Sequence, residues 1–205
     1  MPTPTPGPDP RAAFFDERAA TWEERCYPPE ARARLAQLVP LFGVQTGDAV
    51  LDLGTGTGIL THALRTLVGA EGILVSMDVS FAMVRRAADK TAADRGVAVQ
   101  ATAMGIPLRT ASMDAIICFA AFPHFSDKPL ALREMYRVLK ARGRLCIAHL
   151  LSREELSRHH GGHPAVACDK LPDDAAMRAL FLEAGFPAPA VTDIPGRYLA
   201  LAQKE

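Results

Sequence analysis

The decapeptide AVLDLGTGTG, residues 49–58, carries the strongest structural signal in this chain. A short apolar run leads into three glycines at alternate positions, Gly54, Gly56 and Gly58, and a helical apolar pattern begins at Ile59. This order predicts a buried strand, a tight turn and a helix. Glycine is needed where the backbone turns sharply and a ligand comes close, and the loop amides then face that ligand at the helix N-terminus. In an open α/β sheet, such a crevice binds nucleotides.

A second carboxylate follows at the end of the next apolar run. GILVSMD, residues 72–78, is predicted to be a buried strand that ends in Asp78, 20 residues after Gly58. An acidic residue at this place can accept hydrogen bonds from both hydroxyls of a ribose. Ser80 has the character of a helix N-cap, so the alternative interpretation is that Asp78 only helps to cap the following helix.

The spacing Asp52-x-Gly54-x-Gly56-x-Gly58 differs from the dinucleotide fingerprint G-x-G-x-x-G and resembles motif I of the class I S-adenosylmethionine-dependent methyltransferases. Residues 73–83 and 112–147 also match that family in order and spacing, as in its type 11 and quinone-biosynthesis members. The resemblance implies an α/β fold, a Rossmann-like three-layer sandwich. Its mostly parallel seven-stranded sheet has an antiparallel C-terminal hairpin, and a helical lid precedes it.

The resemblance also implies which residues hold S-adenosylmethionine. Asp52 meets the ammonium group, Asp78 the ribose and Met83 the adenine. In the family an aspartate after the third strand binds the adenine amine, but here Thr102 stands at that position, so this contact lacks a charge. The expected cofactor-binding residues are Asp52, Gly54, Thr55, Gly56, Gly58, Asp78, Val79, Met83, Thr102, Ala103 and Phe119.

The N-terminal segment carries aromatic residues at helical spacing. FFDERAATWEERCY, residues 14–27, falls largely within a helix expected from Arg11 to Glu24. It resembles the lid of small-molecule methyltransferases, which folds over the cofactor and shapes the substrate pocket. Candidate substrate contacts are therefore Phe15, Trp22 and Tyr27. The other interpretation is that these rings only dock the helix on the core, since such a helix needs an apolar face in either case.

Five of the six histidines follow the expected fourth strand. His124 comes directly after that strand and His149 ends the fifth, its expected neighbour in the sheet. We expect both imidazoles to face the cleft and to meet over the transferred methyl group, as catalytic bases or as groups that orient the substrate. His160 lies in the stretch HHGGH, residues 159–163, which we expect in a flexible flap as a further substrate contact.

Two other interpretations of these histidines stay open. In one, His149, His160 and Cys26 are ligands of a metal or of a soft metalloid substrate. In the other, residues 159–163 are a solvated loop. A His-x-x-x-His pair on a helix needs an unbroken helix, and two adjacent glycines at 161 and 162 interrupt it. We therefore predict no resident metal.

Composition limits the remaining possibilities. Lysine plus arginine equal aspartate plus glutamate at 23 each, so no basic excess indicates a nucleic-acid partner. No run of about 18 apolar residues predicts a membrane span, and the proline-rich N-terminus is unlike a signal peptide. Four widely spaced cysteines without a C-x-x-C pair indicate reduced thiols in a cytoplasmic protein. A homodimer is compatible with the sequence.

We expect one domain after a short tail. Five prolines in the first ten residues predict disorder there, and residues 141–144 are the expected turn before the fifth strand. The expected division is a tail at 1–10 and a methyltransferase domain at 11–205, comprising a helical lid (11–45), a cofactor-binding core (49–150), a substrate flap (151–170) and a C-terminal helix and hairpin (171–205).

The sequence thus predicts an enzyme that transfers a methyl group from S-adenosylmethionine to a small-molecule acceptor. One alternative is a methyltransferase directed at a metal, metalloid or thiol through clustered histidine and cysteine. Another is a non-catalytic S-adenosylmethionine-binding protein, which Thr102 in place of aspartate would favour. A dinucleotide-dependent dehydrogenase is disfavoured by the glycine spacing.

Overall fold

A computed structural model describes residues 11–91, 96–161 and 168–205, with the backbone alone at 160 and 161. The tail expected at residues 1–10 lies outside this range. The helices and strands alternate along the chain, as the apolar pattern predicts. They are α1 (Arg11–Asp16), η1 (Ala19–Thr21), α2 (Trp22–Cys26), α3 (Pro29–Leu38), η2 (Val39–Phe42), β1 (Ala49–Leu53), α4 (Thr61–Val68), β2 (Ile73–Asp78), α5 (Phe81–Thr91), β3 (Val97–Gln100), β4 (Met113–Phe119), η4 (Phe122–His124), α6 (Lys128–Val138), β5 (Leu139–His149), α7 (Arg153–Gly161), α8 (Asp174–Glu183), β6 (Ala190–Ile194) and β7 (Arg197–Gln203).

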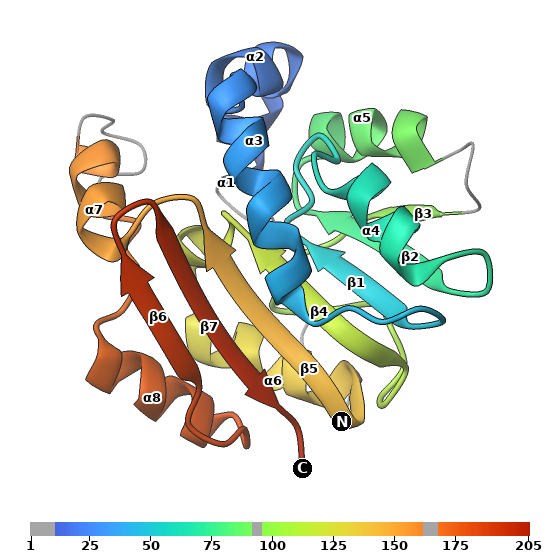
Figure 1. The fold of residues 1–205 in the computed structure, drawn as a ribbon, viewed down its shortest axis with the longest axis vertical. Helices are drawn as coiled ribbons and strands as arrows, with labels where there is room; N and C mark the ends of the chain where they lie inside the picture. The colour runs from blue at the N-terminus through green and yellow to red at the C-terminus, as the bar shows by residue number, and fades with distance from the viewer. Residues whose placement is uncertain (1–10, 92–95, 162–167) are drawn as a thin grey trace.

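One seven-stranded sheet in the order β3-β2-β1-β4-β5-β7-β6 forms the centre of the molecule (Figure 1). The strands from β3 to β5 are parallel, and β7 is antiparallel to both β5 and β6. The predicted fold class and C-terminal hairpin are therefore confirmed. All five residues of β1 are buried, as expected for a central parallel strand covered on both faces. The chain reverses direction in the sheet order between β1 and β4, which makes the carboxyl end of β1 the switch point where ligands bind.

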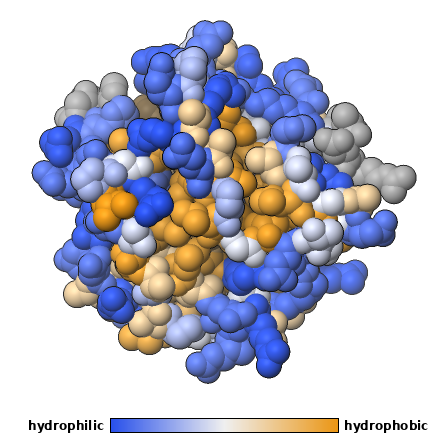
Figure 2. Space-filling view, in the orientation of Figure 1, coloured by the Kyte–Doolittle hydropathy of each residue, from blue (hydrophilic) through white to orange (hydrophobic). Residues whose placement is uncertain are grey.

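Helices cover the sheet on two sides. Alternate residues of a strand point to opposite faces, and they divide the core into two clusters. Phe119 and Ala148 pack with the side chains of α3, η2 and α4, whereas Cys118 and Ile147 pack with those of α6 and α8. Figure 2 shows apolar residues gathered at the centre of the α3 side, over the β5 and β7 part of the sheet, within a hydrophilic rim.

The helices of the N-terminal segment are shorter than predicted. The expected helix from Arg11 to Glu24 is wrong, because the chain forms α1, the 3-10 turn η1 and α2 in succession. Three short elements allow this segment, which with α3 we call the lid, to bend around the end of the sheet near β1 and α5 (Figure 1). A single straight helix has no such bend.

The turn expected at residues 141–144 lies inside the bounds of β5, Leu139–His149. Leu139 pairs with Met113 and Arg144 pairs with Ala115, so residues 140–143 have no partner in β4. Arg142 takes a left-handed backbone conformation there, φ 60°. The polar run therefore bulges out of the pairing, which resumes at Arg144.

The expected flap, residues 151–170, is helical over its first part as α7. Residues 162–167, which include His163, lie outside the described range, and so does the side chain of His160. Within the described residues, no helix is both long enough and apolar enough to pass through a membrane.

Candidate functional site

The glycine loop, residues 54–58, begins where β1 ends. The amides of Gly54 and Thr55 both donate to the carbonyl of Met77 in β2, at 2.8 and 3.0 Å. Gly54 has φ +75°, and a Cβ there would lie 2.2 Å from that of Ala121, so the loop after β4 packs directly on it. At Gly56, φ +54°, a Cβ would have Nε1 of Trp22 as its nearest neighbour, 3.9 Å away. The loop therefore presents bare backbone under the lid.

Asp52 is the buried carboxylate of β1. It is 1% exposed, and its Oδ2 accepts a hydrogen bond of 2.6 Å from the hydroxyl of Thr55. Burial raises the pKa of Asp52 to about 7; the Thr55 hydrogen bond opposes this shift, and the negative charge of Asp78 adds to it. A carboxylate that ionises at such cost is stabilised by a cation beside it.

Asp78 ends β2 on the same face of the sheet. Its Oδ2 accepts from the amide of Gly56 at 2.9 Å, and its Oδ1 from the amide of Ser80 at 2.9 Å. Burial nevertheless raises the pKa of Asp78 above its usual value, against these backbone hydrogen bonds. Ser80 also caps α5, since its hydroxyl accepts from the amide of Met83 at 3.1 Å. Asp78 therefore orients the loop, and its remaining lone pairs can accept from ligand hydroxyls.

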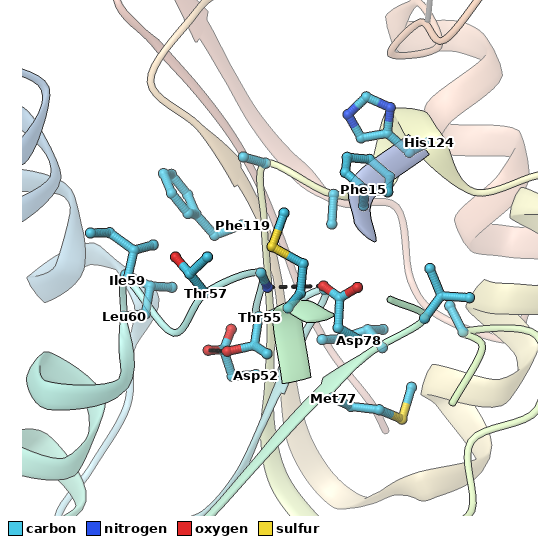
Figure 3. Close-up of a pocket in the computed structure, with 18 of the residues that line it drawn as sticks. Phe15, Asp52, Thr55, Thr57, Ile59, Leu60, Met77, Asp78, Phe119 and His124 are labelled. Atoms are coloured by element: carbon cyan, nitrogen blue, oxygen red, sulfur yellow. Dashed lines mark hydrogen bonds between the residues drawn. The ribbon is translucent and has the colours of Figure 1, made fainter. Parts of the chain in front are cut away.

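One cavity joins these carboxylates to the lid (Figure 3). Asp52 and Asp78 lie at its base, and Phe119 and Phe15 line it further out. The predicted lid residues Phe15, Trp22 and Tyr27 all line it, which places the lid over the glycine loop. The full lining is Arg11, Phe15, Trp22, Tyr27, Asp52, Leu53, Gly54, Thr55, Gly56, Thr57, Ile59, Leu60, Met77, Asp78, Val79, Met83, Ala101, Ala103, Phe119, Ala120, Ala121, His124 and Phe125.

Two acidic residues fasten the lid to this cavity. Asp16 accepts from the Ser80 hydroxyl at 2.5 Å and from the amide of Ala82 at 3.0 Å, at the N-terminus of α5. Glu23 accepts from Thr57 of the glycine loop at 2.7 Å. Sequence reasoning missed both, although they stand inside the segment FFDERAATWEERCY, because only its aromatic residues were interpreted.

His124 lies at the outer end of the cavity. Its Nδ1 is 2.8 Å from Oδ2 of Asp169, and its ring packs edge-on against Phe15 with centroids 5.3 Å apart. The guanidinium of Arg11 binds both oxygens of the Asp169 carboxylate. Sequence reasoning missed Asp169 and Arg11, because contacts over 45 and 158 residues leave no local pattern.

The other predicted histidine is placed differently. His149 is 3% exposed and is not among the residues that line the cavity. It pairs with Tyr198 and follows Ala148, so alternation turns it to the face of the sheet that α6 and α8 cover. The expected meeting of His124 and His149 over the cavity is therefore wrong.

Two expected cofactor contacts also lie off the lining. Thr102 stands between the lining residues Ala101 and Ala103, but its hydroxyl accepts from the amide of Met104 at 3.4 Å. A Cβ at Gly58 would lie 2.8 Å from the Thr61 hydroxyl and 3.1 Å from the backbone of α5, so this glycine permits helix packing.

The described residues hold no group of three or more histidine, cysteine, aspartate or glutamate side chains able to bind a metal together. Cys26, the last residue of α2 in the lid, is an exposed free thiol. The side chain of His160, a candidate for metal and substrate alike, lies outside the described residues.

Comparison with known proteins finds a matching family model and several similar proteins. Residues 51–147 match the family model described as a methyltransferase domain. The chain is 29% identical over 187 residues to the ubiquinone/menaquinone biosynthesis C-methyltransferase UbiE of Yersinia enterocolitica, across 78% of this chain and 74% of that protein. It is 38% identical over 110 residues to UbiE of a Marinomonas species, across 51% of this chain and less than half, 43%, of that protein.

The solved structures agree on the fold. A SAM-dependent methyltransferase from Aquifex aeolicus superposes with a TM-score of 0.74 at 22% identity, covering 90% of this chain and 98% of the other. At this identity the likeness concerns the arrangement of helices and strands. Function still has to be argued from the cavity itself.

Proposed function

We propose that this chain is a class I S-adenosylmethionine-dependent methyltransferase, which binds S-adenosylmethionine beside the glycine loop and transfers its methyl group to a small-molecule acceptor. The observation that carries this proposal is that Asp52 and Asp78, from adjacent strands, open into one cavity over bare glycine backbone. Both carboxylates have raised pKa values, mainly through burial. Such a cavity suits a ligand that brings a cation and hydroxyl donors.

The residues fit the parts of this cofactor. Asp52, fixed by the Thr55 hydroxyl, would pair with the ammonium group. Asp78, oriented by two backbone amides, would accept from the ribose hydroxyls. Met83, Ala101 and Ala103 line the cavity and would pack against the adenine.

Methyl transfer requires mainly that the acceptor is correctly positioned and that water is excluded from the site. When bound, S-adenosylmethionine supplies an electrophilic methyl group on a sulfonium centre. The protein has to align an acceptor with that group and to exclude water. Trp22 and Tyr27 from the lid, with Phe119 from β4, line the cavity and would keep water out.

The outer part of the cavity suits a planar acceptor. The rings of Phe15 and Trp22 pack edge to face with centroids 5.7 Å apart, and Phe125 lines the same cavity. Aromatic side chains gathered in this way favour an aromatic ring over an aliphatic amine or a charged peptide. The similar UbiE proteins are named as C-methyltransferases of quinone biosynthesis. We therefore place a hydroxylated aromatic acceptor here.

Calorimetry with S-adenosylhomocysteine tests the cofactor site. The folded wild-type protein should bind it, and Gly56→Trp should abolish binding, because the indole would fill the cavity. Gly56→Ala is the matched control, since it imposes the same backbone strain without the bulk. Failure of the folded wild-type protein to bind, or unchanged binding by Gly56→Trp, would overturn the proposal.

Turnover tests the reaction. Formation of S-adenosylhomocysteine, measured by mass spectrometry against a panel of hydroxylated aromatic rings, aliphatic amines and thiols, should favour the aromatic members. Tight cofactor binding without turnover on any member would instead support the non-catalytic binding protein.

A further inference from the structure

The outer end of the cavity contains a hydrogen-bonded chain of three side chains from three separate parts of the fold. Arg11 belongs to the lid helix α1, His124 to the turn η4 after β4, and Asp169 to the segment between α7 and α8. Arg11 Nε lies 3.2 Å from Asp169 Oδ2, and the same oxygen lies 2.8 Å from His124 Nδ1. The side chain of Asp169 is only 4% exposed, and that of His124 is 14% exposed.

The charge of Asp169 determines which ring nitrogen carries the proton. Burial alone would raise the pKa of Asp169, but hydrogen bonds from His124 and Arg11 outweigh it and hold that pKa below its usual value. An ionised carboxylate can only accept hydrogen bonds. The neutral imidazole therefore has its proton on Nδ1, and Nε2 is its acceptor nitrogen.

The ring is also held in place by packing. Its edge-to-face contact with Phe15 fixes one side. Lys128 stands nearby, where its ammonium donates to the carbonyls of Pro123 and Phe125 at 2.9 and 3.1 Å. Arg11, Lys128 and Asp169 are therefore charged groups that lie close to this imidazole. Figure 3 shows His124 beside Phe15, at the end of the cavity away from Asp52.

We propose that Asp169 is the positioning residue that holds His124 with its proton on Nδ1, so that Nε2 accepts the hydroxyl proton of the methyl acceptor. This inference rests on the proposed function, because it assigns the proton acceptor of that reaction. It also goes beyond that function, since it assigns a role to a residue that never touches the acceptor. Arg11 of the lid binds the same carboxylate, so the lid contributes one member of this chain.

The proton and electron balance is simple. The acceptor O–H bond breaks and its proton bonds to Nε2, which gives an imidazolium whose other proton remains on Nδ1 against Asp169. The electron pair left on the acceptor forms the new bond to the methyl carbon, through the oxygen or the conjugated ring carbon. If the ring carbon attacks, the C–H bond of that carbon then breaks, its electron pair restores the aromatic ring, and the oxygen regains a proton from solvent. The pair of the broken methyl–sulfur bond stays on sulfur. The imidazolium then returns its proton to water after the products leave.

The first measurement uses the free protein and no cofactor. Long-range ¹H–¹⁵N spectra of ¹⁵N-histidine-labelled protein distinguish the two tautomers, and the His124 signals are those that disappear in His124→Gln. We expect a protonated Nδ1 and an unprotonated Nε2 in the neutral ring. In Asp169→Asn the side-chain amide can donate to Nδ1, so proton density should move to Nε2. A wild-type ring with its proton on Nε2 overturns the proposal, even if Asp169→Asn fails to fold.

The second measurement is kinetic. Asp169→Asn should lower kcat by about 10²-fold or more, the usual contribution of a positioned general base, and should leave the S-adenosylhomocysteine affinity within about twofold. Asp169→Glu should recover part of kcat. Asp174→Asn, an exposed carboxylate at the start of α8, is the matched control and should behave as wild type.

Arg11→Gln separates positioning from simple anchoring of the lid. If Asp169 only anchored Arg11, the two variants would change KM and kcat alike and both would leave the tautomer unaltered, which overturns the proposal. We expect Arg11→Gln to act mainly on KM and Asp169→Asn mainly on kcat. Failure of the wild-type protein to bind S-adenosylhomocysteine would refute the proposed function instead, whatever the tautomer spectrum shows.

Discussion

The carboxylate of Glu23 accepts a hydrogen bond of 2.7 Å from the hydroxyl of Thr57, so the lid helix α2 is bonded directly to the glycine loop. Lys90 of α5 and Arg32 of α3 bind the same carboxylate. Burial alone would raise the pKa of Glu23, but hydrogen bonds from Lys90, Thr57 and Arg32 outweigh it and lower that pKa to about 2. One side chain thus joins the lid to two other parts of the cofactor site.

Glu23→Gln should therefore loosen the lid and weaken cofactor binding. A partly exposed charged hydrogen bond contributes about 0.7–1.4 kcal/mol, so we expect the affinity for S-adenosylhomocysteine to fall by about 3- to 10-fold in calorimetry. Glu24→Gln, at the exposed neighbouring position, is the matched control. An equal loss in both variants would show that general charge, and not the Thr57 contact, is responsible.

Glu23 also predicts acid sensitivity. Its folded pKa lies below the ordinary glutamate value of 4.5, so its contribution to stability is complete above about pH 4.5 and is lost as the pH falls towards about 2. The unfolding free energies of wild type and Glu23→Gln, from urea titrations, should converge across this range. Parallel curves from about pH 5 to about pH 2 would contradict this assignment.

The pKa of Asp52 is raised, whereas that of Glu23 is lowered. We therefore expect cofactor binding to depend on pH near neutrality. With a folded pKa of about 7, it is largely protonated in the free protein at about pH 6 and must lose that proton to pair with an ammonium group. Affinity for S-adenosylhomocysteine should therefore rise from about pH 6 towards about pH 8, by up to about tenfold per unit below the pKa. Calorimetry in buffers of different ionisation enthalpy should detect proton release.

The stability of the free protein should change in the other direction. Since the folded pKa of Asp52 is raised, its contribution to stability is complete below the unfolded pKa near 3.8 and is lost as the pH rises through about 7. Asp78, also raised, acts in the same sense. Asp52→Asn should lose most of the binding slope, and a slope as steep as that of wild type in this variant would refute the role given to Asp52.

The sequence was sufficient for the sheet and for the base of the cavity. Apolar runs that end in Gly54 and in Asp78 are local patterns, and the mostly parallel sheet with its antiparallel C-terminal hairpin followed from the family that those patterns resemble. The positions of Asp52, Asp78 and the lid aromatic residues followed from the same patterns. These residues all line one cavity, as expected.

The sequence failed where position depends on the whole fold. His149 was expected at the cavity because it ends the fifth strand. Side chains alternate between the two faces of a strand, so His149, which follows Ala148, points to the face that α6 and α8 cover. The partnership of His124 with Asp169 depends on a segment 45 residues away. The polar run at 141–144 was interpreted as a turn that precedes the fifth strand, whereas β5 already begins at Leu139 and the run bulges out of its pairing with β4.

Thr102→Val tests the position at which this chain has threonine and the family that it resembles has aspartate. The Thr102 hydroxyl bonds to the amide of Met104 and does not line the cavity. Valine has nearly the same shape, so we expect the affinity for S-adenosylhomocysteine to stay within about threefold. Asp78→Asn, which would weaken the proposed contact with the ribose hydroxyls, should cost more than about tenfold. A tenfold loss in Thr102→Val, about the contribution of one hydrogen bond, would show that the hydroxyl contacts the cofactor.

Gly54 and Gly56 should respond differently to the same substitution. Both have positive φ, so alanine costs about 1–2 kcal/mol at either place. At Gly54 the new methyl group would lie 2.2 Å from the Cβ of Ala121 and would push the loop after β4 away. At Gly56 the nearest atom is 3.9 Å away. Overpacking typically adds about 1–3 kcal/mol, so urea unfolding should show a larger loss for Gly54→Ala. Equal losses would mean that the two loops separate freely, and the cavity would then lack the rigid base that cofactor binding requires.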